Sequence, residues 1–298
     1  AGNLRGIPQG TALAAETTPA MDPPLAVSWD AKGENVVLGV PSITPPGEYD
    51  VALNWVDERG RRSGERFTLT VDEMPRLASG TGLPVVLLNG LQLGILDSCP
   101  ISSSSAATFG MLEQQLVQIG STTLFFDNCK ECRNCSIERL GAVFGQFLVG
   151  VTYTTGERYL GEFDLVGHSM GGLIARAYLA GKQETSGLFI PPANHRVRKL
   201  VTIGTPHFGS YKSADWGTQT GQLTPGSRFI WDLATWNQLG DDLRGVDALA
   251  IAGNGCDYGD SPAAGDGMVS LTSASLTFAR SDERTRIIPY RHSDSSYN

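Results

Sequence analysis

The sequence has no apolar run long enough to cross a bilayer. Its longest nearly uninterrupted apolar stretch, residues 141–151, is 11 residues long, whereas a spanning helix needs about 20. Basic residues are also scarce: 23 lysines and arginines stand against 31 aspartates and glutamates, and no basic run occurs. The resulting net charge of −8 argues against a nucleic-acid-binding surface, because such surfaces are positive.

Charged residues make up only 18% of the 298 residues, while glycines number 36. This composition is typical of a compact, loop-rich protein and excludes a disordered chain. The length allows one large domain with a full core, or a main domain with a small companion.

Cysteines are few, and four of the five lie between Cys99 and Cys135. Cys129, Cys132 and Cys135 have C-x-x-C-x-x-C spacing, which would serve a metal or cluster only with a fourth ligand and reduced thiolates. We favour disulfides and predict that Cys99 pairs with one of these three. With Cys256 the count is odd, so a monomer keeps at least one cysteine unpaired.

The expected location is secreted or periplasmic. Disulfide-forming cysteines fit an oxidising compartment, and a removed signal peptide would explain a chain that starts at Ala1, as would trimming. Secretion is therefore the expectation for this chain.

The first quarter of the chain favours β-structure. Residues 1–19 have little apolar patterning and are expected to form a mobile arm. Residues 20–75 contain short runs rich in Val, Thr and aromatics, such as "NVVLGV" and "RFTLTV", which predict a small β-rich domain. Residues 45–72 resemble the last strands of bacterial immunoglobulin-like modules. The alternative is that these strands are leading hairpins of the main sheet.

Residues 80–298 alternate predicted strands with predicted helices. Apolar runs that read as buried strands are "PVVLLNG", "TTLFFDN", "FDLVGHS", "KLVTIGTP", "VDALAIAG" and "TRIIPY". Helical patterns lie between them in "TFGMLEQQLVQIG", in residues 136–153 and in "GGLIARAYLA". This alternation predicts an α/β fold with a mostly parallel sheet and right-handed crossovers.

One serine stands between two glycines where a predicted strand becomes a helix. Residues 167–171, "GHSMG", fit the G-x-S-x-G pattern in that strand–helix context. Such a turn strains the serine backbone, lifts the hydroxyl above the strand ends and points the N–H groups of the next helix at any oxyanion formed there. We therefore predict that Ser169 is a nucleophile and not merely a turn residue.

Together, "GHSMGGLIARAYLAG" and "VRKLVTIGTPHFGS" resemble the secreted lipase and esterase branch of the α/β-hydrolase superfamily. The resemblance extends from about residue 83 to the C-terminus. It implies the eight-stranded hydrolase sheet or a reduced version of it, and a triad in the chain order Ser, acid, His.

Four histidines compete for the role of base. His168 lies inside the turn and is expected to pack, and His195 lies in the polar run "ANHRVRK" and is expected to be solvated. His207 precedes every acid candidate, and in the resembling family its loop shapes the site without supplying the base. His292 follows the last predicted strand, where the family places its base. We assign it as general base toward Ser169 and general acid toward the leaving group.

The acid is expected after the penultimate strand, where Asp257, Asp260 and Asp266 are candidates. "GDGMVS" matches the family's Asp-Gly-x-Val turn, and Asp266 precedes His292 by 26 residues, enough for a helix and a strand. We favour Asp266 and expect Asp257 and Asp260 to be loop or cation-facing carboxylates.

An oxyanion hole needs two N–H donors. Met170 follows the nucleophile directly, and Leu91 holds the matching position in the loop after the first core strand. Here the chain departs from the family, which usually has His-Gly where this sequence has Asn89-Gly90. An asparagine can hold the loop through its amide, so we expect the hole to be intact.

Residues 208–245 interrupt the alternation where lipase-like enzymes carry a cap. Their aromatic side chains would contact substrate or a lipid or polymer surface, or would simply pack. These are Tyr211, Trp216, Phe229, Trp231 and Trp236.

The sequence thus predicts a secreted serine hydrolase that cleaves ester or lipid substrates through a Ser-His-Asp triad, with no metal or organic cofactor. Alternatives with the same triad are a cutinase-like polyester hydrolase and an acyltransferase. Two alternatives come from other classes. One is a catalytically silent hydrolase fold that acts as a binding protein, and the other is a metal protein with cysteine ligands.

Overall fold

The computed structural model of the chain describes residues 7, 10–22, 24–29, 36–40, 47–56, 60–71, 75–79, 82–92, 105–132, 135–213, 217–236, 243–257, 264–276 and 284–292. The chain divides into two compact units, Ala1–Pro75 and Arg76–Asn298. Within the described ranges, no helix combines the length and apolarity needed to cross a membrane.

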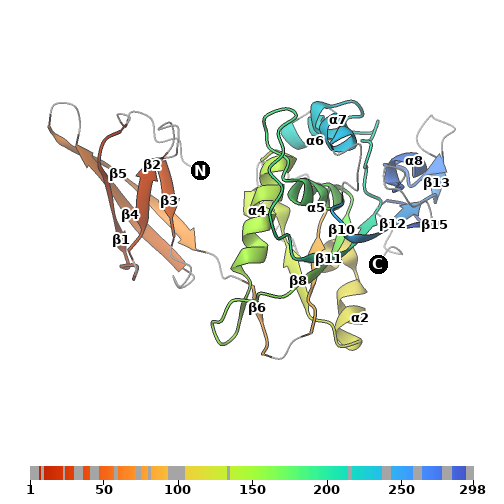
Figure 1. The fold of residues 1–298 in the computed structure, drawn as a ribbon, viewed down its shortest axis with the longest axis horizontal. Coiled ribbons are helices and arrows are strands. Elements are labelled where there is room, and N and C mark those ends of the chain that lie inside the picture. The colour runs from red at the N-terminus through yellow and green to blue at the C-terminus, as the bar shows by residue number, and fades with distance from the viewer. Residues whose placement is uncertain are drawn as a thin grey trace. The chain divides into compact units, whose positions relative to one another are not determined.

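The first unit consists of antiparallel strands (Figure 1). Strands β1 (Leu13–Thr18), β4 (Gly47–Val56) and β5 (Arg62–Val71) form one sheet in the order β1-β4-β5, and β2 (Ala26–Trp29) pairs with β3 (Val36–Gly39). A small cluster of Met21, Leu25, Tyr49 and Val51 is buried here. These strands belong to sheets of their own and are not hairpins of the main sheet.

Strand β1 corrects, at residues 13–18, the expectation of a mobile arm over residues 1–19. Its residues pair with β4 from Leu13 opposite Trp55 to Thr18 opposite Asp50, with alternate side chains half-buried. The inward positions include Ala15 and Thr17, which are small or polar. The apolar period of a strand is therefore too weak to be seen in "LAAETT".

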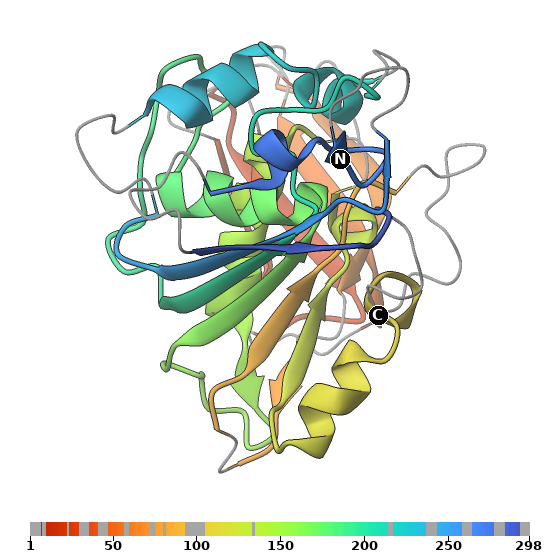
Figure 2. The ribbon, with the colours of Figure 1, turned by 90° about the vertical axis from the view of Figure 1, so that its right-hand side faces the viewer.

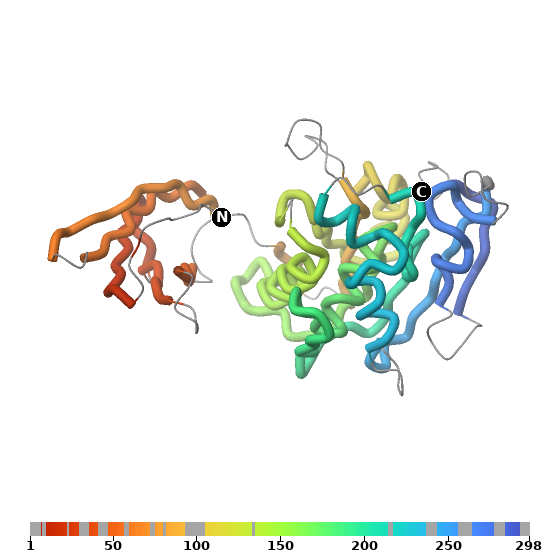
Figure 3. The backbone as a smooth tube through the Cα atoms, turned by 90° about the horizontal axis from the view of Figure 1, so that it is seen from above, coloured from red at the N-terminus to blue at the C-terminus, as the bar shows by residue number. Residues whose placement is uncertain are grey.

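The second unit confirms the predicted α/β fold with a parallel sheet. All six strands run parallel in the order β15-β12-β11-β10-β7-β8. Figure 3 shows the C-terminal strands at one edge of this unit. The strands are β7 (Val85–Leu88), β8 (Thr123–Phe126), β10 (Phe163–His168), β11 (Val197–Ile203), β12 (Asp247–Gly253) and β15 (Thr285–Ile288).

Helices cover both faces of this sheet (Figure 2). Val86 and Leu88 of β7 join a large buried cluster with side chains of α4 (Ile137–Gly150) and α5 (Met170–Ala180). Val85 and Leu87 instead join a cluster with Phe109, at the end of α1 (Ser105–Phe109) and ahead of α2 (Leu112–Gln118). Because strand side chains alternate between faces, a strand buried on both sides reads as a continuous apolar run.

The shorter elements lie between these. Helix α4 begins after Ser136, whose hydroxyl accepts the N–H of Arg139, and it ends before β9, so it is shorter than the predicted 136–153. The remaining elements are β6 (Arg76–Leu77), α3 (Asn128–Cys132), β9 (Thr152–Tyr153), β13 (Cys256–Asp257), β14 (Ala264–Gly265) and α8 (Leu271–Ala274).

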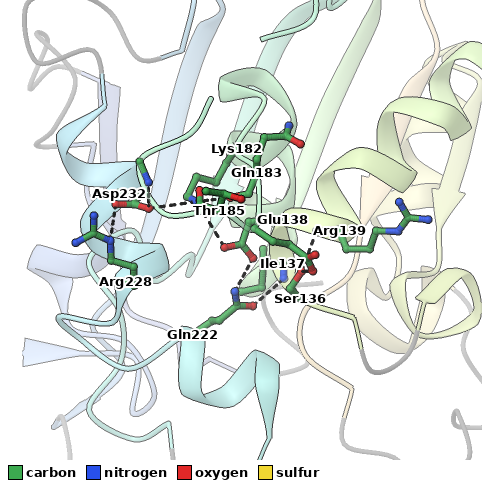
Figure 4. A network of polar contacts seen from close by, with 12 residues as sticks. Ser136, Ile137, Glu138, Arg139, Lys182, Gln183, Thr185, Gln222, Arg228 and Asp232 are labelled. Atoms are coloured by element: carbon green, nitrogen blue, oxygen red, sulfur yellow. Dashed lines mark hydrogen bonds and ion pairs between the residues drawn. The ribbon is translucent and has the colours of Figure 1, made fainter. Parts of the chain in front are cut away.

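The insertion at residues 208–245 contains α6 (Thr218–Gln222) and α7 (Arg228–Thr235), and a buried ionic network holds it to the core (Figure 4). The ammonium of Lys182 lies 3.2 Å from Asp232 of α7 and 3.8 Å from Glu138 of α4. The side chains of all three are at most 6% exposed. Gln222 of α6 bonds Glu138 and accepts the N–H of Ile137. Losing Lys182 would remove the ammonium that faces the buried carboxylate of Glu138, and a buried charge without its partner typically costs about 3–5 kcal/mol.

The aromatic residues of the insertion divide into two groups. Phe229 is buried, and Trp236 stacks on Phe189 with ring centroids 5.0 Å apart. Tyr211 and Trp231 are 82% and 57% exposed. Trp216 lies outside the described residues.

Candidate active site

Ser169 occupies the turn between β10 and α5. Its backbone adopts φ 53° and ψ −125°, a region that non-glycine residues rarely enter and that costs of order 1–3 kcal/mol. The turn is fixed by the Ser169 N–H, which donates to the carbonyl of Ile203 at 2.8 Å on the neighbouring strand. The parallel sheet thus presents the hydroxyl at the carboxyl ends of its strands.

A chain of hydrogen bonds links Ser169 to His292 and Asp266. The Nε2 atom of His292 lies 2.9 Å from Ser169 Oγ, and its Nδ1 atom lies 2.8 Å from Asp266 Oδ2. A carboxylate oxygen only accepts, so Nδ1 carries the proton and Nε2 offers its lone pair to the serine hydroxyl. In this tautomer the imidazole can take the proton from Ser169.

Two backbone N–H groups orient the Asp266 carboxylate. Oδ1 accepts from Met268 at 2.9 Å and Val269 at 2.7 Å, which leaves Oδ2 for His292. The side chain of Asp266 is 0% exposed. The His292 N–H also donates to the Asp266 carbonyl at 2.8 Å, so backbone and side chain both join the C-terminal segment to this turn.

Gly204 makes room for the contact between acid and imidazole. Its φ is +54°, and a Cβ atom there would lie 2.9 Å from Asp266 Oδ2 and 3.1 Å from His292 Nδ1. Any side chain at this position would press on the hydrogen bond between the two groups.

The other histidines have different surroundings. His168 Nε2 lies 3.0 Å from the His292 carbonyl, so this ring supports the segment that carries His292. The sequence predicted only that His168 packs, without this polar contact. His207 is 0% exposed, between Arg176 at 3.3 Å and the Thr202 hydroxyl at 3.2 Å. His195, expected to be solvated, is only partly exposed, and its Nδ1 accepts the Val197 N–H at 3.0 Å.

Two of these histidines are held neutral. Burial, and to a smaller extent the charge of His292, lowers the pKa of His168 to about 4. Burial, followed by the charge of Arg176, lowers the pKa of His207 well below its ordinary value. Because a guanidinium only donates, His207 Nδ1 must accept from Arg176, and a neutral ring meets that need.

We therefore predict that the free energy of unfolding falls as the pH drops from about 6.5 to about 4. In this range the unfolded chain binds protons on both histidines that the folded chain largely excludes, and each contributes a slope of at most about 1.4 kcal/mol per pH unit. Urea unfolding at a series of pH values measures the slope. The variant His207→Gln, whose side chain keeps a hydrogen-bond acceptor and a donor, should have a smaller slope. If its slope equals that of the unchanged protein, the prediction is contradicted.

The two predicted oxyanion donors belong to different elements. Met170 is the first residue of α5 and is buried. Leu91 lies in the loop after β7 and packs against the large cluster. In the same loop, Asn89 is fully buried, and its side-chain oxygen accepts the Asn128 N–H at 3.2 Å. Sequence reasoning did not single out Asn128, although it is the last residue of the run "TTLFFDN" that predicts a strand.

Two of the clustered cysteines bond to each other. Cys132 and Cys135 form a disulfide, and Cys129 is disulfide-bonded as well. Cys99 lies outside the described residues, as do Asp260 and the side chains of Cys256 and Asp257, so the pairing of Cys99 stays a prediction. No group of three or more histidines, cysteines or carboxylates in the described part of the chain is arranged to hold a metal ion.

Comparison with known proteins identifies the fold. Residues 149–278 match the family described as "PGAP1-like alpha/beta domain", and no curated protein sequence matches significantly. The mature form of the Bacillus licheniformis lipase BlEst2 superposes with a TM-score of 0.50 and 18% identity, covering 74% of this chain and 89% of that chain. Its propeptide form gives a TM-score of 0.51 and 19% identity, covering 74% and 48%. At such identities the likeness shows the fold alone.

Proposed function

We propose that this chain, which has an α/β-hydrolase-like fold, hydrolyses carboxylic esters of lipase or esterase type through an acyl-enzyme on Ser169. The observation that carries the proposal is the continuous hydrogen-bonded chain from buried Asp266 through His292 to the hydroxyl of Ser169. This arrangement activates a serine for acyl transfer on several unrelated folds.

In this mechanism, Ser169 Oγ attacks the ester carbonyl while its proton passes to His292 Nε2. Asp266 stabilises the resulting imidazolium through the Nδ1–H bond and keeps the ring in place. The backbone N–H groups of Leu91 and Met170 bind the tetrahedral oxyanion, and His292 returns the proton to the departing alcohol. Water then repeats the cycle on the acyl-enzyme.

The proposal includes secretion and an ester or lipid substrate. Disulfides persist in oxidising compartments. The Cys132–Cys135 bond therefore supports the proposal that the protein is secreted. The exposed Tyr211 and Trp231 of the insertion are aromatic groups suited to transient contact with a lipid or polymer surface.

Active-site titration with a fluorophosphonate tests the proposal, followed by p-nitrophenyl esters from acetyl to palmitoyl. We expect one label per chain, located on Ser169, and turnover of at least the short esters. A folded protein that neither labels nor turns over would instead be the catalytically silent alternative. Preference for long chains would indicate a lipase, cleavage of polyester films a cutinase-like enzyme, and transfer to added alcohols an acyltransferase.

A further inference from the structure

The loop that carries Leu91 lies between two neighbouring strands. In the sheet order β10-β7-β8, this loop follows β7, Ser169 follows β10 and Asn128 follows β8. All three strands are parallel, so their carboxyl ends meet at one edge of the sheet. The loop therefore has Ser169 on one side and Asn128 on the other.

Asn128 binds this loop with three hydrogen bonds. Its side-chain nitrogen donates to the carbonyl of Asn89 at 3.0 Å and to that of Gly90 at 2.8 Å. Its backbone N–H donates to the Asn89 side-chain oxygen. Asn128 and Asn89 are 3% and 0% exposed. An amide nitrogen carries two hydrogens, so one side chain satisfies both carbonyls.

These bonds fix the direction of two N–H groups. In a planar trans peptide the C=O and N–H bonds point in opposite directions, and the Asn89–Gly90 and Gly90–Leu91 peptides are trans. With both carbonyls turned toward Asn128, the N–H groups of Gly90 and Leu91 point away from it, toward the β10 side of the loop. That side holds Ser169.

Gly90 brings this part of the loop against the nucleophile. A Cβ atom on Gly90 would lie 2.8 Å from Ser169 Cβ and 3.3 Å from Ser169 Oγ. The backbone that Asn128 orients therefore lies so close to the reacting serine that no side chain fits between them, and a small rotation of its peptides would redirect the donors.

We infer that Asn128 is a positioning residue that aims the oxyanion donor of Leu91, an inference that rests on the proposed ester hydrolysis. Asn128 is itself held in place: the Asp127 carboxylate accepts the N–H groups of Cys129 and Lys130, and Cys129 is disulfide-bonded. The asparagine at position 89, where the resembling family usually has histidine, thus has a partner at the start of α3, just after the adjacent strand β8.

The test compares Asn128→Asp and Asn128→Ala with the unchanged protein. The carboxylate of Asn128→Asp keeps the shape but repels the two carbonyls. Complete loss of one oxyanion donor costs about 10²–10³ in turnover, so misdirection should lower kcat by about 10- to 100-fold while KM stays within about threefold. Affinity for a trifluoromethyl ketone, which forms a tetrahedral adduct, should fall by the same factor as kcat/KM. The kcat of Asn128→Asp should recover relative to the unchanged protein at low pH, where its protonated carboxyl can donate.

Gln222→Glu is the matched control, because it makes the same amide-to-acid change in the network that anchors the insertion. It should lower Tm while kcat stays within about threefold. Should Asn128→Ala fail to fold, Asn128→Asp carries the test. Folded Asn128 variants with unchanged kcat would overturn the inference, as would a lowered kcat without loss of ketone affinity. Failure of the unchanged protein to react with fluorophosphonate would refute the proposed function instead.

Discussion

Ser169→Ala should lower kcat for p-nitrophenyl acetate by about 10⁵–10⁶-fold, the scale seen when a serine nucleophile is removed. Without Oγ there is no acyl-enzyme, and neither His292 nor the backbone donors can replace it. The fold should persist, since the change removes a hydrogen bond to His292 and alanine fits the same space. The measurements are steady-state hydrolysis, fluorophosphonate labelling and thermal unfolding.

Ser136→Ala provides a control with the same chemical change. Ser136 caps α4, and losing such a cap costs about 1 kcal/mol, so Tm should fall while turnover remains. Ordinary turnover by Ser169→Ala would place the nucleophile elsewhere and remove the proposed mechanism. Lost labelling in both variants would point to instability as the cause.

The architecture of the second unit was predictable because its strands are buried on both faces. The run "VVLL" of β7 supplies Val86 and Leu88 to one cluster and Val85 and Leu87 to the other, and its shortness and its two valines favour a strand over a buried helix. Strand β1 was missed for the opposite reason. Only Leu13 on its half-buried face is a large apolar side chain; Ala15 is small and Thr17 is polar, so only pairing with β4 reveals the strand.

Those residues of the candidate site were predictable that directly follow a strand or a recognisable turn along the chain. Ser169 follows a strand in a recognisable turn, and Asp266 and His292 occupy positions that the resembling family uses after later strands; parallel strands bring their carboxyl ends together. The contacts of Asn128 and Lys182 were not predictable in this way. Both depend on which strands and helices are neighbours in space, such as β8 beside β7 or α7 beside α5, and neither is marked by a local motif.

Asp266→Asn should lower kcat by about 10⁴-fold while leaving the turn intact. The new amide oxygen would take over the N–H groups of Met268 and Val269 that Oδ1 now accepts. Its NH₂ group would then face His292 Nδ1, which must accept, so the ring proton would move to Nε2. A protonated Nε2 cannot take the proton from Ser169, and this wrong-tautomer effect has the stated size in other triads. Steady-state kinetics and thermal unfolding measure both consequences.

Asp164→Asn is the matched control for this change, because Asp164 pairs with Arg198 on β11, and that partly exposed pair contributes at most about 1 kcal/mol. Its kcat should equal that of the unchanged protein. A loss below tenfold in Asp266→Asn would mean that another carboxylate, such as Asp257 or Asp260, supports His292. The double variant with Ser169→Ala discriminates further. Residues that act as one unit are not additive, so adding Asp266→Asn to Ser169→Ala should cost no further activity, whereas independent roles would multiply the two losses.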